Sequence, residues 1–189
     1  TSGNNIINES SDTITIGASG DTTNIVGTLQ NNGSAVASTN GITMADIWRL
    51  TANVTSNGFI TSNLERADDA SYGKIGTGMT ESSGVFTFPS TGIYLVQSQG
   101  TFYCETGGDN VKLFTYVTIN NSSYDLTVQV FGGANNQENT GFGTCLVDVT
   151  DTSNVKVKFD GNSIGTNSYI SADTDNNKTS FTFIRLGDT

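Results

Sequence analysis

The sequence predicts an all-β sandwich domain built from many short strands, and the jelly roll is a common version of that architecture. Apolar residues alternate with polar ones at strand period, and no window holds a convincing amphipathic helix. The composition agrees, because 22 glycines and many Thr, Ser and Asn residues suit strands and polar turns. The 10 Phe and 6 Tyr residues supply large side chains for a core.

Strands are expected throughout the chain after residue 40, separated by clusters of Asn, Asp, Gly and Ser. The clearest of these turn clusters are Glu105–Asn110 and Gly132–Asn136. The predicted strands are Ala45–Val54, Gly58–Leu64, Tyr72–Met79, Val85–Phe88, Gly92–Gln99, Val111–Ile119, Ser123–Phe131, Thr144–Val149, Asn154–Phe159 and Lys178–Leu186.

The first 40 residues differ from the rest, which predicts two parts, residues 1–40 and residues 41–189. Every aromatic residue lies at or after Trp48, so the first part cannot bury enough area to fold alone. It is nevertheless patterned, because Thr13–Gly17 and Asn24–Leu29 alternate with strand period. We expect an extended β-rich stalk in which three chains share an apolar axis, or else a loose arm or linker.

Charge and residue types exclude several classes of function. The net charge of −10 argues against a nucleic-acid partner, which would require clustered Lys and Arg. The chain has no histidine, which the usual catalytic triads and many common zinc sites require. No apolar run is long enough to cross a membrane. We therefore expect no enzyme activity, no cofactor and no membrane insertion.

The two cysteines, Cys104 and Cys145, lie in separate strand-like segments without metal-binding spacing. They are interpreted either as small buried hydrophobic residues or as a disulfide between packed strands. A catalytic thiol is the least favoured interpretation.

One phrase carries a family resemblance. Ser83–Leu95, which includes the only proline, reads Ser-Gly-Val-Phe-Thr-Phe-Pro-Ser-Thr-Gly-Ile-Tyr-Leu. It resembles the Gly-x-Phe-x-x-Pro-x-x-Gly-x-Tyr hallmark of the C1q/tumour-necrosis-factor-like jelly rolls. Leu146–Val157 is similar to the late hairpin of that family, and Lys178–Leu186 to its last strand. The likeness extends over residues 42–187.

This resemblance implies a compact homotrimer whose central and last strands line the trimer axis. By that likeness, Phe181 and Phe183, or their neighbours on one face, would form intersubunit core. The residues that we expect in the core or at the trimer interface are Trp48, Phe86, Tyr94, Phe181 and Phe183.

The N-terminal residues carry a different resemblance. A collagen stalk would repeat Gly-x-y with frequent proline, and residues 1–40 contain no proline. The Gly- and Asn-rich leader instead resembles bacteriophage tail-fibre and appendage proteins. Ala45–Thr51 and Ile60–Arg66 are similar to C-terminal domains of marine phage, or cyanophage-type, structural proteins. The likeness implies a virion protein assembled in the host cytoplasm, attached to other virion proteins through residues 1–40.

Polar clusters offer weaker candidate sites. Asp173 and Asp175 lie in a run of oxygen-bearing side chains that suits calcium, although such a run also forms ordinary turns. Two carboxylate pairs, Glu81 with Asp125 and Glu65 with Asp68, could be considered for glycosidase chemistry. Nothing in the sequence determines their separation, and the chain is short for a polysaccharide-cleaving tailspike.

The sequence thus favours a non-enzymatic trimeric fibre or appendage whose jelly-roll knob contacts a host surface glycan or protein. Loops 105–110, 132–143 and 160–177 are the predicted contacts. Lys156 and Lys158 alternate with valines, which indicates a half-buried strand with one solvent-exposed face or a sheet edge protected by charge, and a receptor contact is the less favoured interpretation. The alternatives are a capsid-bound fibre, decoration or cement protein and a secreted C1q-type lectin or ligand.

Overall fold

The computed structural model describes residues 30–31, 34–35, 41–106, 110–133 and 135–189. By Cα proximity the chain separates into two units, residues 1–40 and residues 41–189. In the first unit, β1 (Gln30–Asn31) pairs antiparallel with β2 (Ser34–Ala35). Most residues of the predicted stalk or arm lie outside the described part of the chain.

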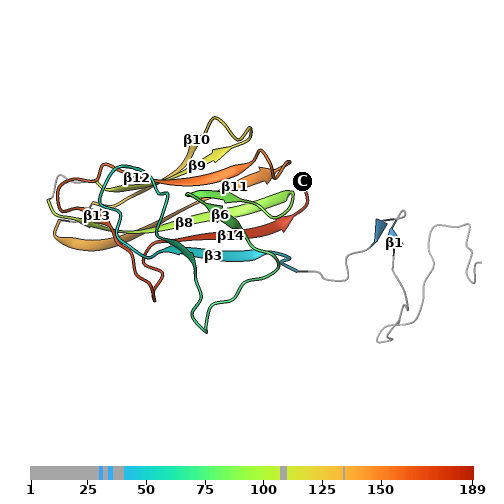
Figure 1. Cartoon of the computed structure of the whole chain (residues 1–189), viewed down its shortest axis with the longest axis horizontal. Coiled ribbons are helices and arrows are strands. Elements are labelled where there is room, and N and C mark those ends of the chain that lie inside the picture. Colours follow the sequence, from blue (N-terminus) through green and yellow to red (C-terminus); the bar gives the residue numbers. More distant parts are fainter. Residues whose placement is uncertain (1–29, 32–33, 36–40, 107–109, 134) are drawn as a thin grey trace, which may run out of the picture. The chain divides into compact units, whose positions relative to one another are not determined.

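The second unit is a sandwich of two antiparallel sheets, and the described residues contain no helix. Figure 1 shows β9, β10 and β12 in one layer and β3, β8 and β14 in the other. The prediction of an all-β sandwich is therefore confirmed.

One layer, here called the β12 sheet, has the order β10-β9-β12-β7-β6, and β4 also pairs with β12. Its members are β4 (Gly58–Phe59), β6 (Thr80–Ser82), β7 (Val85–Thr87), β9 (Lys112–Thr118), β10 (Asp125–Phe131) and β12 (Lys156–Asn162).

The other layer, here called the β14 sheet, has the order β11-β8-β14-β3-β5, and β13 also pairs with β8. Its members are β3 (Ala45–Leu50), β5 (Leu64–Arg66), β8 (Gly92–Cys104), β11 (Gln137–Val149), β13 (Tyr169–Ile170) and β14 (Ser180–Gly187).

The core between the layers is dominated by aromatic rings. Phe159 of the β12 sheet stacks on Phe181 of the β14 sheet, with ring centroids 3.7 Å apart. Phe86 lies 5.2 Å from Phe183 and 5.4 Å from Trp48, again joining the two layers. Offset and edge-to-face ring pairs of this kind add to the stabilisation from area burial.

The Pro89–Gly92 turn carries the chain from one sheet to the other. β7 precedes it in the β12 sheet, and β8 follows it in the β14 sheet. The Tyr94 hydroxyl donates a hydrogen bond to the Ser90 carbonyl oxygen at 3.0 Å, which ties the turn to the start of β8. Gly92 adopts a φ of 141°, a conformation that favours glycine.

Several predicted strands differ from the observed ones. Gly58–Leu64 is divided, because β4 pairs in the β12 sheet and β5 in the β14 sheet. Tyr72–Met79 is irregular, since Gly76 and Gly78 turn the chain with φ of 67° and 77°. Leu146–Val157 is not a hairpin, because β11 and β12 belong to different sheets.

Candidate functional site

The outward face of the β14 sheet carries an unusual row of apolar side chains. Leu146 of β11 is paired with Leu95 of β8, which is paired with Ile184 of β14, which is paired with Ala45 of β3. Successive side chains of a strand alternate between faces, and the neighbours Val96 and Phe183 are buried in the core. The row therefore points away from the core, and Leu146 is 64% exposed.

Further apolar side chains extend this row, and we call the whole set the apolar face. Phe142 of β11 is 74% exposed, and Leu186 of β14 is 51% exposed. Members of the apolar face are Ile93, Leu95, Phe142, Leu146, Ile184 and Leu186.

Charge is confined to the ends of the apolar face. Along β11 the outward positions run from Glu138 to Asp148, and the positions between them carry Thr140, Phe142, Thr144 and Leu146. The facing outward positions of β8, from Ile93 to Thr101, are also uncharged. Charged residues are depleted in the centres of protein–protein interfaces, whereas aromatic residues are enriched there. The composition of the face is thus typical of an interface.

A cluster of charges bounds the apolar face on the β3 side. Arg49 points outward from β3, yet it is 1% exposed because the segment 65–72 lies over it. Its guanidinium lies 2.7 Å from Glu65, 2.8 Å from Asp68 and 2.6 Å from Asp69. The hydrogen bond from Arg49 to Asp69 is the main cause that raises the pKa of Arg49. The cluster holds this segment across β3.

The opposite end of the apolar face has its own polar contact. Glu138 Oε1 accepts a hydrogen bond from the Ser171 hydroxyl at 2.7 Å and lies 3.2 Å from Lys178 Nζ. The Ser171 hydrogen bond, with a smaller contribution from Lys178, lowers the pKa of the Glu138 carboxyl.

The aromatic residues expected in the core or at a trimer interface lie inside the single chain. Phe86, Tyr94, Phe181 and Phe183 each have no exposed surface, so they are not available to a second subunit. Trp48 is partly buried against the same core, and its Nε1 donates to Asp46 at 3.0 Å. An interface would instead be formed by their neighbours on the outward face.

The disulfide interpretation of the cysteines is wrong for this chain, because both thiols are free. Cys104 is paired with Gln137, and Cys145 lies eight positions further along the same strand. At about 3.4 Å per residue that is roughly 27 Å, far beyond the reach of a disulfide. Cys104 is fully buried, and burial raises the pKa of the Cys145 thiol.

The acidic residues considered as sites form turns and ion pairs. Asp173 Oδ1 accepts backbone hydrogen bonds from Asp175 at 2.8 Å and Asn176 at 2.9 Å, and these bonds lower the pKa of Asp173. This geometry is that of an Asx turn. Within the described ranges, no group of three or more His, Cys, Asp or Glu residues could hold a metal ion.

One carboxylate pair is too widely separated for a glycosidase, and the other is engaged by Arg49. Glu81 on β6 and Asp125 on β10 lie on opposite edge strands of the β12 sheet. Four strand spacings of about 4.8 Å separate these edges by roughly 19 Å, whereas glycosidases hold their carboxylates about 5–9.5 Å apart. Glu65 and Asp68 both contact Arg49, as described above.

The predicted contact loops are only partly loops. The segment 132–143 includes the first half of β11, which begins at Gln137, and the segment 160–177 includes the end of β12 and all of β13. Residues 107–109 and 134 lie outside the described part of the chain. No helix in the described part is long and apolar enough to cross a membrane.

Comparison with solved structures places this geometry in a known fold. Murine APRIL at pH 5.0 aligns with a TM-score of 0.56 and 12% identity, over 76% of this chain and 98% of that chain. Eiger TNF from S. frugiperda aligns with a TM-score of 0.56 and 14% identity, over 79% of this chain and 96% of that chain. The chain therefore has a TNF-like jelly-roll fold, as the resemblance implied.

The comparisons extend no further than the fold. The PRD1 vertex protein P5 aligns less well, with a TM-score of 0.49 and 17% identity over 78% of this chain and 99% of that chain. No protein-family profile matches the sequence, and no curated protein matches it.

Proposed function

We propose that the chain is a non-enzymatic structural protein of a virion, a homotrimeric fibre or appendage whose jelly-roll knob contacts a host surface ligand. The observation that carries this proposal is the uncharged apolar face of the β14 sheet, whose most exposed members, Phe142 and Leu146, lie on the edge strand β11. Joining copies through this face would remove those side chains from water, which favours association.

The assignment to a virion has a separate basis. It depends on the resemblance of residues 1–66 to phage appendage proteins, and on the Gly- and Asn-rich leader that would attach the knob to other virion proteins. A rigid knob with three equivalent ligand sites would gain avidity over a single site, because the second and third contacts are effectively intramolecular.

Oligomeric state is the direct test. Light scattering after size exclusion should give about 60 kDa, which is three times the chain mass of 19.9 kDa. Leu146→Asp should dissociate the trimer, because it places a carboxylate within the apolar face without a partner. Ile119→Asp is the matched control, since Ile119 is 75% exposed on the β9–β10 connection.

Two results would contradict the proposal. A wild-type chain that elutes as a monomer at assay concentrations would remove the trimer. Equal dissociation by both Asp substitutions would show that general surface charge, rather than the apolar face, controls association.

Location on the particle separates the proposed appendage from its alternative. Gold-labelled antibody against residues 41–189 should mark the tips of appendages in electron micrographs of intact particles. Uniform labelling of the shell would favour a decoration or cement protein instead, and recovery of the chain only as a secreted cell product would favour a C1q-type ligand.

A further inference from the structure

The outward face of the β12 sheet carries a group of aromatic rings around a lysine. Lys158 Nζ on β12 lies 4.2 Å from the ring centroid of Tyr124 and 5.1 Å from that of Phe59. Phe59 in turn meets Tyr116 edge-on, with ring centroids 5.3 Å apart. We call these four residues the lysine–aromatic cluster. It remains accessible, because Phe59 is 45% exposed.

Positive charge gathers on this face of a strongly acidic chain. Four of the eight basic residues, which are Arg49, Arg66, Lys178 and Arg185, form ion pairs with carboxylates. Three others, Lys112, Lys156 and Lys158, share the outward face of β9 and β12, and none forms an ion pair with a carboxylate of the described residues.

Each of the three lysines has neutral partners. Lys156 is 8% exposed and donates to Thr87 Oγ1 at 3.0 Å, and Lys112 lies over the ring of Phe131. Asp160 shares this face but is also 8% exposed, and its burial raises the pKa of its carboxyl. Since Lys158 forms no ion pair with a carboxylate of the described residues, its ammonium can pair with an anion from outside the chain.

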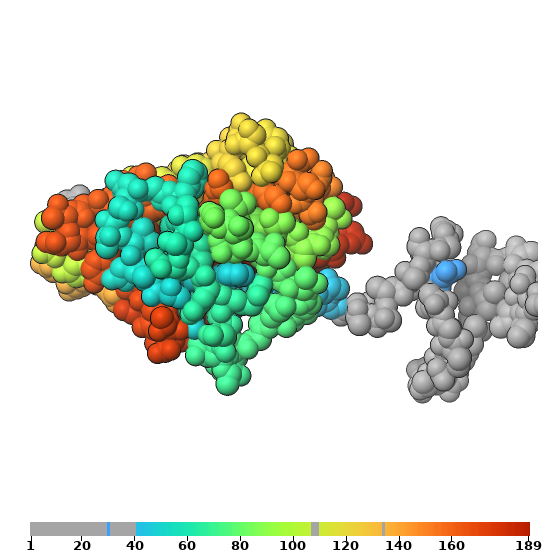
Figure 2. Space-filling view, viewed as in Figure 1, coloured from blue at the N-terminus to red at the C-terminus, as the bar shows by residue number. Residues whose placement is uncertain are grey.

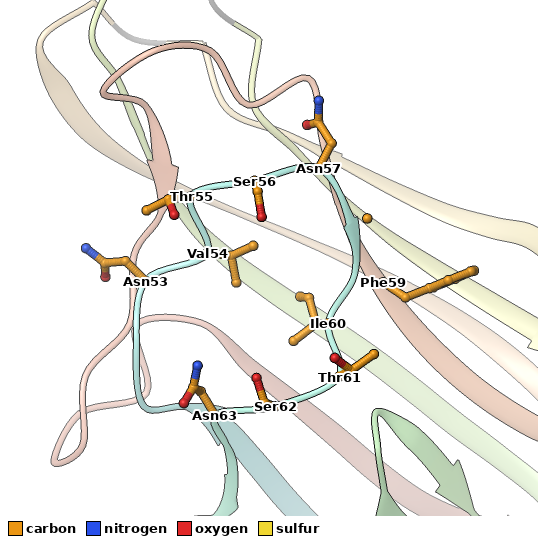
Figure 3. Close-up of a pocket in the computed structure, with 11 residues that line it drawn as sticks. Asn53, Val54, Thr55, Ser56, Asn57, Phe59, Ile60, Thr61, Ser62 and Asn63 are labelled. Carbon is orange, nitrogen blue, oxygen red and sulfur yellow. The ribbon is translucent and has the colours of Figure 1, made fainter.

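A hollow of about 220 Å³ lies next to the cluster, enclosed by the loop of residues 53–63. Figure 3 shows Val54 and Ile60 pointing into this loop, whereas Phe59 points away from it, toward the strands of the β12 sheet. Val54 and Ile60 are therefore apolar lining residues of the hollow. Phe59 belongs both to the lining of the hollow and to the lysine–aromatic cluster. The remaining lining residues are almost all polar: Asn53, Thr55, Ser56, Asn57, Thr61, Ser62 and Asn63.

The loop is held in place from several sides, so the hollow is preformed. Val54 and Ile170 exchange two backbone hydrogen bonds of 3.0 Å. The amide oxygens of Asn53 and Asn57 accept backbone hydrogen bonds from Ala172 and Ile164, both at 2.8 Å. The segment near residue 60 also reaches the molecular surface, where it is teal in Figure 2. A preformed site avoids the cost of ordering a loop on binding.

We propose that the lysine–aromatic cluster and the 53–63 hollow together bind an acidic glycan. The apolar face of a sugar ring stacks on the exposed ring of Phe59, and its carboxylate or sulfate pairs with Lys158. Neighbouring hydroxyl groups reach the Ser, Thr and Asn side chains of the hollow. This site deepens the proposed host contact and rests on it. A long polyanion such as nucleic acid is disfavoured by the net charge of −10.

Titration calorimetry with the full chain tests the site. The probes are a galacturonic acid hexamer, a sulfated galactan hexamer and, as the neutral probe, a glucose hexamer. We expect at least one acidic probe to bind, with an affinity that falls as salt rises, and the neutral probe to bind at least about tenfold more weakly. The two acidic probes distinguish carboxylate from sulfate recognition.

Variants locate the binding. Phe59→Ala and Lys158→Gln should each lower the affinity for the acidic probe about tenfold. Lys74→Gln is the control, because Lys74 is a cation away from this face that donates to the Thr77 carbonyl oxygen. The control should bind as the wild type does, and the melting temperatures of all variants should show that they are folded.

Each contrary result has a defined meaning. Failure of both acidic probes to bind, equal binding of the neutral probe, unchanged affinity in both cluster variants, or tighter binding of a thymidine oligonucleotide would overturn the glycan site. A trimer without glycan affinity would leave the proposed assembly intact, whereas a monomer that binds the acidic probe would leave the site intact and overturn the trimer.

Discussion

The two outward faces of the sandwich differ in charge although both are built from the same alternation of strand residues. The apolar face on the β14 sheet presents Leu146 and Phe142 and has charge only at its ends. The face on the β12 sheet presents Lys158 among aromatic rings, with two further lysines beside it. An uncharged face suits contact with another apolar surface, because ionic groups are costly to bury there. A face whose cations have no carboxylate partner among the described residues suits a charged ligand.

The contrast also places the proposed assembly surface and the proposed glycan site on different sheets of the chain. The two sheets pack face to face across the aromatic core, so a partner bound to the outward face of one sheet leaves the outward face of the other sheet exposed. Substitutions on one face, at its boundary or at the alternating inward and outward positions of its strands can therefore test the difference between the two faces.

The largest effect on stability is expected at Arg49, in the charged cluster beside the apolar face. Arg49→Gln removes the cation that Glu65, Asp68 and Asp69 share, and it leaves three neighbouring carboxylates facing an uncharged group. We expect a loss of about 3 kcal/mol in urea unfolding, below the top of the range for buried pairs because the carboxylates are partly exposed. Segment 65–72 should also lose protection in hydrogen exchange.

The control for this variant is Lys178→Gln, which removes an ion pair whose two side chains are 37% and 39% exposed. That pair should contribute less than about 1 kcal/mol. Similar losses in the two variants would mean that the Arg49 cluster does not hold the segment in place.

An intermediate effect is expected where inward and outward positions alternate on β11. A Cβ at the inward Gly143 would lie 2.3 Å from Val128 Cγ1, because β10 of the other sheet packs against β11 here. Gly143→Val should therefore cost about 2 kcal/mol of unfolding free energy. Thr144→Val, at the adjacent outward position, should change stability little. Denaturant unfolding of both variants checks the alternation, and equal losses would contradict it.

The smallest effect is a pH dependence of opposite sign on the two faces. Hydrogen bonding from Ser171 lowers the pKa of Glu138 from 4.5, so its contribution is present above pH 4.5 and lost as pH falls through the lowered value. Burial raises the pKa of Asp160 from 3.8, so its contribution is present below pH 3.8 and lost as pH rises through the raised value.

Glu138→Gln should therefore lower the unfolding free energy at pH 7 by less than about 1 kcal/mol, and the loss should become smaller as pH falls below 4.5. Asp160→Asn should leave stability at pH 7 unchanged or slightly higher. Carboxyl titration by NMR checks the two pKa directions. A shift of the same sign at both residues would remove this part of the contrast.

The sequence predicted the jelly roll because the alternation and the Ser83–Leu95 phrase are local signals. The strands that it predicted for β8 and β11 are too short, because polar and glycine residues such as Gly141 and Gly143 are typical of loops. Here they are strand residues whose missing side chains admit Val128 and Val130 of the facing sheet. Close packing between sheets of this kind leaves no local trace in a sequence.

The candidate sites were less predictable for two reasons. Ile93, Tyr94, Leu95 and Val96 are all apolar, which indicates a strand covered on both faces but does not say which face would form the proposed interface. The lysine–aromatic cluster joins Phe59, Tyr124 and Lys158, which lie far apart in the sequence. Only the register of β4, β9 and β12 brings them together.

The position of β14 has a consequence for synthesis. This strand lies between β8 and β3, so the first and last strands of the sandwich are neighbours in one sheet. A ribosome that has released everything up to β13 has released a chain whose β14 sheet still lacks a central member. The pairing of β14 with β8 and β3 can therefore be completed only after Gly187 has emerged. Until then the core lacks Phe181 and Phe183, and such incomplete sheets expose apolar surface and strand edges that favour aggregation.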